Sequence, residues 1–92
     1  MHAKPVTIPA TDQMLANTPR LLYGWSVHES DAVPAVASFL LRNGSVSGQV
    51  VAAVELLANA SETKSFAHPV YVDQGIFVDV VGGVFEGSIY VS

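Results

Sequence analysis

The sequence contains no cysteine, so no disulfide can stabilise the fold, and only His2, His28 and His68 could give nitrogen ligands to a structural zinc ion. Charge is also scarce, since 13% of the 92 residues are charged, against about 25% in an average soluble domain. Because so short a chain has much surface and a small interior, some apolar side chains must lie outside its core. We therefore expect this protein to bury part of its surface against other proteins.

Two further absences exclude classes of partner. The four basic residues are scattered along the chain and the net charge is −4, so we expect no nucleic-acid partner bound through its phosphates. No apolar run approaches the roughly 20 residues of a membrane-spanning helix. The first residues also lack the hydrophobic stretch of a signal peptide. We expect no membrane partner and synthesis in a cytoplasm.

What the sequence does contain is a series of short apolar segments separated by turn residues, a pattern typical of a sandwich or barrel. The expected strands are residues 20–29, 35–42, 49–57, 63–66, 75–81 and 84–91. Residues 49–57 also fit a helix because of their alanines, but we prefer a strand because the neighbouring segments are strands. Histidine 68 and proline 69 are expected in a loop.

The fold class that follows is all-β. We predict a small antiparallel β-sandwich or flattened barrel of about six to seven strands with an extended N-terminal arm. The arm would be residues 1–19, which contain several prolines, and the sandwich would be residues 20–92. A two-glycine turn at residues 82–83 predicts a hairpin between the last two strands.

Alternation along each strand predicts which side chains share a face. The predicted sets are Leu21, Tyr23, Trp25 and Val27; Ala37, Phe39 and Leu41; Val50, Ala52, Val54 and Leu56; and Phe85, Gly87, Ile89 and Val91. Trp25 is expected in the core because its neighbours on that face are apolar. The other possibility is that Trp25 and Tyr23 form an exposed platform on which a sugar stacks.

No arrangement typical of an enzyme stands out. Ser45 and Ser47 lie between glycines but lack the strand-to-helix turn of a nucleophile elbow. Asp79 and Glu86 flank the two-glycine turn and could approach each other as an acid/base pair, although their alternation with apolar residues fits a solvent or interface face better. We predict no enzymatic activity and no catalytic residues.

Metal and cofactor sites are not expected either. The residues that could assemble a metal site are His28, Glu29 and Asp31 with His68 or Asp73, but their spacing matches no standard motif. Of the possible metal sites, a calcium ion bound by the acidic loops is the one that the sequence supports best. Residues 82–83 are no phosphate site, because no helix follows them.

The order of four segments resembles small structural proteins of tailed bacteriophages. These segments are residues 21–29 (LLYGWSVHE), 39–44 (FLLRNG), 50–56 (VVAAVEL) and 75–91 (GIFVDVVGGVFEGSIYV). The resemblance covers roughly residues 21–91 and points to head decoration proteins, which reinforce the capsid from outside. Residues before Pro19 match no pattern of that family.

This resemblance implies a non-enzymatic virion protein, made in the host cytoplasm, that binds the outer capsid surface as an oligomer. Its expected partners are further copies of itself, as a trimer, and the major capsid protein. N-terminal arms commonly contact the shell in such proteins. On position alone, the expected capsid-binding residues are Lys4, Pro5, Val6, Thr7, Ile8, Met14 and Leu15. The alternative is a carbohydrate- or receptor-binding β-sandwich of a phage fibre or adhesin.

Overall fold

The structure, a computed structural model, describes residues 3–9 and 11–92. Residues 1, 2 and 10, which belong to the predicted arm and include His2, lie outside the described residues. The described residues form eight strands and no helix. They are β1 (Lys4–Thr7), β2 (Gln13–Ala16), β3 (Arg20–Glu29), β4 (Ala37–Asn43), β5 (Val50–Leu56), β6 (Ser61–Val72), β7 (Ile76–Gly82) and β8 (Phe85–Val91). Accordingly, none of the described residues belongs to a helix that could span a membrane.

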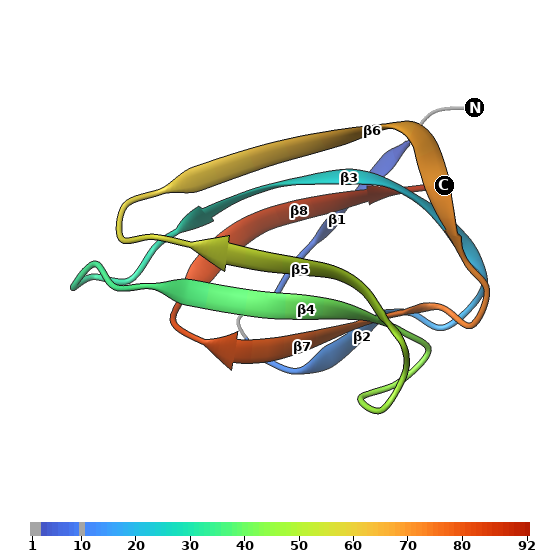
Figure 1. Cartoon of the computed structure of the whole chain (residues 1–92), viewed down its shortest axis with the longest axis horizontal. Coiled ribbons are helices and arrows are strands. Elements are labelled where there is room, and N and C mark those ends of the chain that lie inside the picture. The colour runs from blue at the N-terminus through green and yellow to red at the C-terminus, as the bar shows by residue number, and fades with distance from the viewer. Residues whose placement is uncertain (1–2, 10) are drawn as a thin grey trace.

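The strands form two four-stranded antiparallel sheets packed face to face (Figure 1). The first sheet has the order β1-β8-β3-β6 and the second has the order β2-β7-β4-β5. Each strand of the first half pairs with its mirror-image counterpart in the second half: β1 with β8, β2 with β7, β3 with β6 and β4 with β5. This nested pairing, folded over into two sheets, is the jelly-roll topology.

The core lies between the sheets and is apolar. Phe39 of the second sheet stacks on Phe85 of the first, with ring centroids 4.6 Å apart. The fully buried side chains with relative exposure below 2% include Leu22, Leu41, Ile76, Ile89, Val72 and Val78. Burying side chains of this size stabilises the fold by about 1.5–3 kcal/mol each. The sheets therefore hold together by alternating inward side chains, as the sequence predicted.

Most expected strands are confirmed, including the strand form of residues 50–56. The side chains predicted to share a face do so in β4 (Ala37, Phe39, Leu41) and in β8 (Phe85, Ile89, Val91), and these faces are buried. The prediction for β3 is right in part. Trp25 and Val27 face the core, but Leu22 joins them in place of Leu21 because a bulge between Leu22 and Gly24 shifts the alternation by one residue.

Gly24 occupies the tightest point of that bulge. Its φ is 152°, and a Cβ atom added there would collide with the backbone carbonyl of Lys64 on β6. Opposite Gly24, β6 contains a larger bulge. Between the pairs Leu22–Val70 and Gly24–Ser65, β6 has four residues (66–69), whereas β3 has only Tyr23. The loop predicted at His68 and Pro69 is thus wrong, since both residues belong to the bulged strand β6.

Two other predictions are wrong. The glycines at residues 82–83 do not close a hairpin, because β7 pairs with β2 and β4 whereas β8 pairs with β1 and β3. They let the chain cross from one sheet to the other, and Gly83 adopts a positive φ of 79° there. The structure does not show the N-terminal arm either. Its residues form β1 and β2, one edge strand of each sheet, and Ile8 is buried in the core.

Candidate interaction surface

The outer face of the first sheet carries many polar side chains, together with Tyr90 and the exposed Tyr71. Side chains that alternate with the buried ones point outward here, and paired neighbours form a row of four hydroxyls, Thr7, Ser88, Ser26 and Thr63, one from each strand. The hydroxyl oxygens of Ser26 and Thr63 lie 3.3 Å apart. On the same face, His28 Nε2 and Glu86 Oε1 lie 2.7 Å apart in an exposed contact. We call this surface the hydroxyl face.

The outer face of the second sheet is largely apolar. Its outward positions follow from the pairing of Met14 with Phe77, of Phe77 with Arg42, and of Leu40 with Ala53. We call this surface the apolar face, and its apolar members are Met14, Leu40, Val50, Ala53, Phe77 and Val81. Leu40 and Phe77 are half-buried, whereas Val81 is 64% exposed. An antiparallel sheet that faces water on one side normally carries polar residues there.

One ion pair lies in the middle of the apolar face. Arg42 Nε donates to Asp79 Oδ2 at 2.8 Å, and Arg42 Nη1 donates to the carbonyl oxygen of Gly48 at 3.0 Å. The two side chains are 23% and 21% exposed. The neighbouring apolar side chains hold this pair partly out of water, so its charges cancel within the chain and the face has little net charge.

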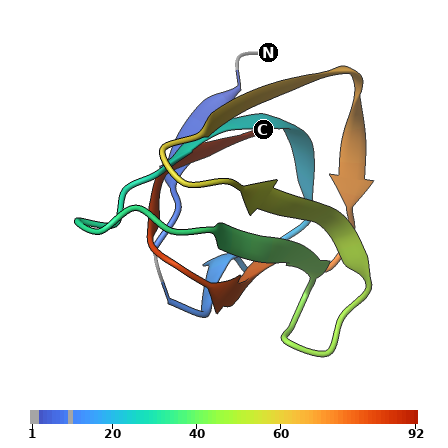
Figure 2. The same cartoon turned by 60° about the vertical axis from the view of Figure 1, so that its left-hand side comes forward.

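The apolar surface continues onto one end of the sandwich, seen at the left of Figure 1. Three connections meet there, because Ser30 N donates to Val84 O and Glu29 N donates to Ala60 O. The exposed apolar side chains of this end, which we call the apolar end, are Val33, Val36, Leu57 and Val84. Figure 2 shows the same end from another side, with the connection between β3 and β4 projecting furthest.

The carboxylate of Glu29 organises the apolar end. Glu29 is only 6% exposed, and its two oxygens accept the backbone N–H groups of Asn59 at 2.8 Å and Asp31 at 2.7 Å. The bond from Asn59 is the main reason that the pKa of Glu29 lies below its ordinary value, while burial acts in the opposite direction. One buried carboxylate thus ties two loops together in its ionised form.

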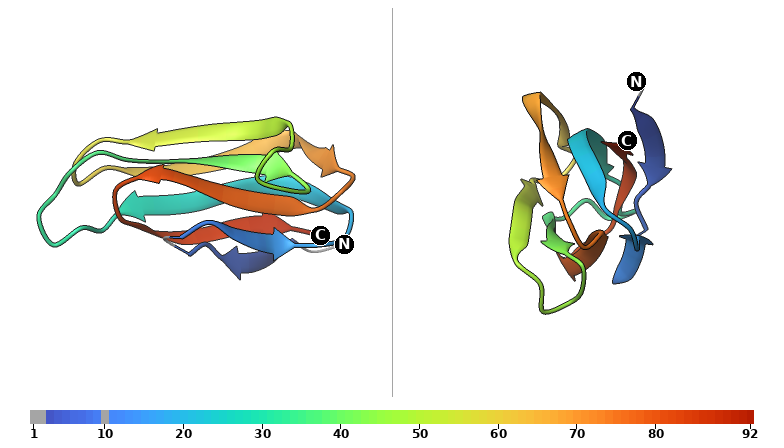
Figure 3. Two further views of the ribbon diagram at one scale, coloured as in Figure 1. Left: turned by 90° about the horizontal axis from the view of Figure 1, so that it is seen from below. Right: turned by 90° about the vertical axis from the view of Figure 1, so that its right-hand side faces the viewer.

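The expected capsid-binding residues lie on the two edge strands β1 and β2. Lys4, Pro5 and Thr7 are exposed on β1, whereas Val6 packs against the core and Ile8 is 3% exposed. The two strands form the edges of their sheets on the same side of the sandwich, as the end-on view of Figure 3 shows. The structure therefore keeps part of this set at the surface, and its role in binding stays a prediction.

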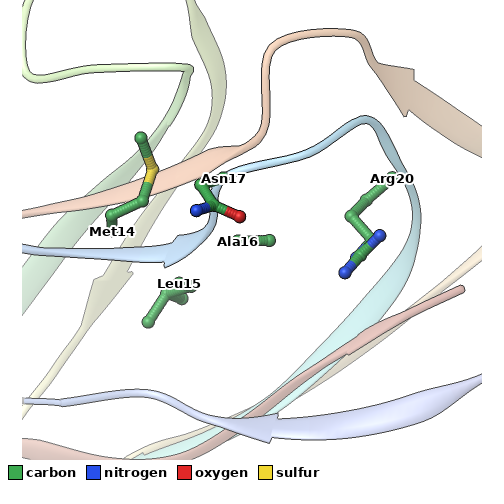
Figure 4. Close-up of a pocket in the computed structure, with 5 residues that line it drawn as sticks. All are labelled: Met14, Leu15, Ala16, Asn17 and Arg20. Carbon is green, nitrogen blue, oxygen red and sulfur yellow. The ribbon is translucent and has the colours of Figure 1, made fainter.

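Met14 and Leu15 also line an open pocket of about 380 Å³, together with Ala16, Asn17 and Arg20. In Figure 4 the side chains of Met14 and Leu15 point in opposite directions from β2. Arg20 is the basic group of this pocket, and its guanidinium donates to the carbonyl oxygen of Pro19 at 3.3 Å. The pocket is next to the apolar face, which it joins through Met14.

The residues considered for chemistry do not come together. Asp79 pairs with Arg42 on the second sheet and Glu86 contacts His28 on the first, so the two carboxylates do not form the acid/base pair that was the less favoured interpretation of their positions. Asp73, which follows the end of β6, accepts a hydrogen bond from Asn43 Nδ2 at 2.7 Å. Glu29 instead binds Asn59, which precedes the start of β6. Residues 3–9 and 11–92 contain no group of three or more His, Asp or Glu side chains that could hold a metal ion.

Trp25 is buried, as expected for a core residue. It is 5% exposed, its ring meets Phe66 edge-on at 5.6 Å, and Nε1 donates to Glu62 Oε2 at 2.7 Å. A ring enclosed in this way offers no face on which a sugar could stack.

The apolar face is not among the surfaces predicted from the sequence. The signal was present in β4 and β7, where Leu40 and Phe77 occupy the positions that alternate with core residues and are apolar as well. Comparisons with protein-family models, with curated proteins and with solved structures gave no match.

Proposed function

We propose that this protein is a non-enzymatic structural component of a tailed-phage virion. In this proposal it binds the outer surface of the capsid as an oligomer and reinforces the contacts between neighbouring major capsid subunits. The observation that supports the proposal is the apolar face, which places Leu40, Phe77 and Val81 on the outside of a two-layered domain. Large exposed apolar patches on small soluble domains commonly mark protein contacts.

The difference between the two faces supports the same idea. A protein that coats a shell needs one surface for the shell and another for water. The apolar face and the apolar end fit the first role, since apolar side chains gain most by leaving water. The hydroxyl face, with Ser26, Thr63 and Ser88, fits the second role.

The jelly-roll fold is compatible with this function but does not single it out. The fold occurs in viral capsid domains and in lectins, and one fold commonly hosts several functions. The burial of Trp25 counts against the carbohydrate-binding alternative, which relied on an exposed aromatic ring.

Stabilisation of the shell would follow from mass action. A protein that binds the assembled shell, and not the separate subunits, shifts the equilibrium towards the assembled state. An oligomer that contacts several subunits at once also gains affinity through effective concentration. A modest apolar interface per chain is then sufficient, and threefold symmetry stays the expectation that the phage resemblance implies.

The proposal can be tested by co-sedimentation of the full chain with empty shells assembled from the major capsid protein of the same phage. Phe77→Gln should weaken binding by about 30-fold or more, the effect of losing a central apolar contact. The matched control is Tyr90→Gln, which changes an aromatic side chain on the hydroxyl face and should alter binding by less than about threefold.

Failure of the wild-type protein to co-sediment with the shells at saturating concentration would contradict the proposed function. So would equal losses from the two substitutions, because the apolar face would then have no special role. Circular dichroism of both variants checks that the sheets are intact.

A further inference from the structure

A two-sheet sandwich has four edge strands. In this protein three of them are blunted, which means that they carry features that hinder pairing with a further strand. β1 (Lys4–Thr7) has four residues, of which one is a lysine and one is Pro5, which lacks an N–H group. β2 is equally short and contains a bulge. β6 contains Pro69, a large bulge, and the charged side chains of Glu62 and Lys64 opposite the buried Val27 and Trp25. Short length, proline, bulges and inward charges are the features that prevent edge-to-edge pairing.

The fourth edge, β5, has few of these features. It is seven residues long (VVAAVEL), contains no proline and has one charge, Glu55. Its only irregularity is a bulge at its beginning, at residue 51, so Ala52 to Leu56 run regularly beside β4. β5 pairs with β4 on one side only, and it runs along the rim of the molecule in Figure 3. A regular, apolar edge to which no further strand is paired favours the addition of another strand.

The sequence of this edge is complementary to itself. In an antiparallel pair related by a twofold axis at Val54, Ala52 of each copy lies opposite Leu56 of the other, so a small side chain meets a large one. Glu55 lies opposite Ala53, so the two carboxylates do not face each other directly. Inward residues meet inward residues, because opposite positions of a pair share a face.

A second copy also fits electrostatically. Each chain has a net charge of −4, so two copies repel each other unless they meet where charge is low. Near β5 the apolar face carries Arg42 and Asp79, which neutralise each other, and the single carboxylate of Glu55.

We propose that two copies of this protein pair antiparallel through β5 about a twofold axis near Val54, which joins their second sheets into one continuous sheet. This inference rests on the self-association in the proposed function and replaces threefold with twofold symmetry. Because Val50 and Ala53 lie next to the edge, pairing makes the apolar faces of the two copies contiguous. The dimer then presents one double-sized apolar surface to a partner.

The test is sedimentation equilibrium of the full chain, combined with amide hydrogen exchange at several protein concentrations. The wild type should dimerise, and the amides of β5 should become more protected as the concentration rises. Ala53→Glu puts two pairs of like charges opposite each other across the axis and should weaken the dimer roughly tenfold. Adding Glu55→Lys to that variant turns both pairs into attractive ones and should restore the dimer.

The matched control is Ser65→Glu, which adds the same charge to an exposed position of the blunted edge β6 and should change the dimer constant by no more than about twofold. A monomer at every concentration, a trimer, or a dimer whose β5 amides exchange freely would overturn the pairing. Failure of the charge reversal to restore the dimer would overturn the proposed register. Shell binding is measured separately, so a monomer that still co-sediments would overturn the pairing and the self-association but leave the binding to the capsid standing.

Discussion

The two sheets of this protein contribute equally to one core, yet their outer faces differ in chemistry. Strand by strand, the first sheet places Ser26, Thr63 and Ser88 outside, whereas the second places Leu40 and Phe77 at equivalent outward positions. Alternation alone decides which side chains point outward in each sheet. The composition of the outward positions is a separate property of the sequence, and it distinguishes a face for water from a face for a partner.

The ion pairs on the two faces differ in the same way. Arg42 and Asp79 on the apolar face are little exposed, and the arginine also binds the carbonyl of Gly48. His28 and Glu86 on the hydroxyl face are 50% and 65% exposed, so water competes with their contact. The central ion pair of the apolar face is thus satisfied within the chain, so a partner can cover it without leaving either of these two charges unpaired.

The largest expected effect tests whether each face is four strands wide. The first sheet has four strands only if β1 belongs to it. Ile8 directly follows β1, and its side chain lies in the core. Ile8→Ala should lower the free energy of unfolding by about 2–4 kcal/mol, measured by urea denaturation. Thr7→Ala, an exposed change in the same segment, should cost no more than about 0.5 kcal/mol. Equal small effects would show that this segment is a detached arm after all.

A second experiment sharpens the contrast between the ion pairs. Arg42→Met leaves Asp79 half-buried without its partner and should cost about 1–2 kcal/mol of unfolding free energy. His28→Gln removes the exposed pair and should cost less than about 0.5 kcal/mol. Combining Arg42→Met with Asp79→Leu should recover part of the first loss, since no unpaired charge then remains. Equal costs for Arg42→Met and His28→Gln would contradict the difference between the faces.

The smallest effect concerns pH and the apolar end. The pKa of Glu29 is lower in the folded protein, chiefly because of the bond from Asn59, so its stabilising contribution is complete above the ordinary pKa of a glutamate. The contribution is lost as the pH falls through the lowered value. The melting temperature of the wild type should therefore fall more steeply below pH 5 than that of Glu29→Gln. At neutral pH this variant should melt several degrees lower, because its amide nitrogen cannot accept the second backbone bond. Parallel melting curves at every pH would contradict this role.

Much of the fold could be predicted from local patterns. Period-two alternation correctly grouped the side chains that share a face in β4 and β8, since regular strands keep the same phase throughout. It was wrong where the phase changes, because the bulge at Gly24 depends on the approach of Lys64, which is distant in sequence. The glycines at residues 82–83 correctly predicted a turn. The predicted hairpin was wrong, because a turn does not determine which sheet the next strand joins.

The interaction surface was predictable only in part. The scarcity of charged residues indicated that some apolar side chains would lie on the surface, but it did not indicate which strands carry them. The N-terminal residues are predicted to form an arm because they contain several prolines and a polar stretch, and local patterns cannot show their pairing with β8 and β7. Leu40 and Phe77 became recognisable as a surface only once the pairing of β4 with β7 was known.

The nested pairing of the strands has a consequence for synthesis. The β4–β5 hairpin joins neighbouring segments and can form early, whereas β1 must wait for β8 at the far end of the described chain. Loop closure over so many residues is slow, so jelly rolls belong among the slowly folding topologies. On the ribosome, the hairpin that bears the open edge emerges well before the strands that complete the fold.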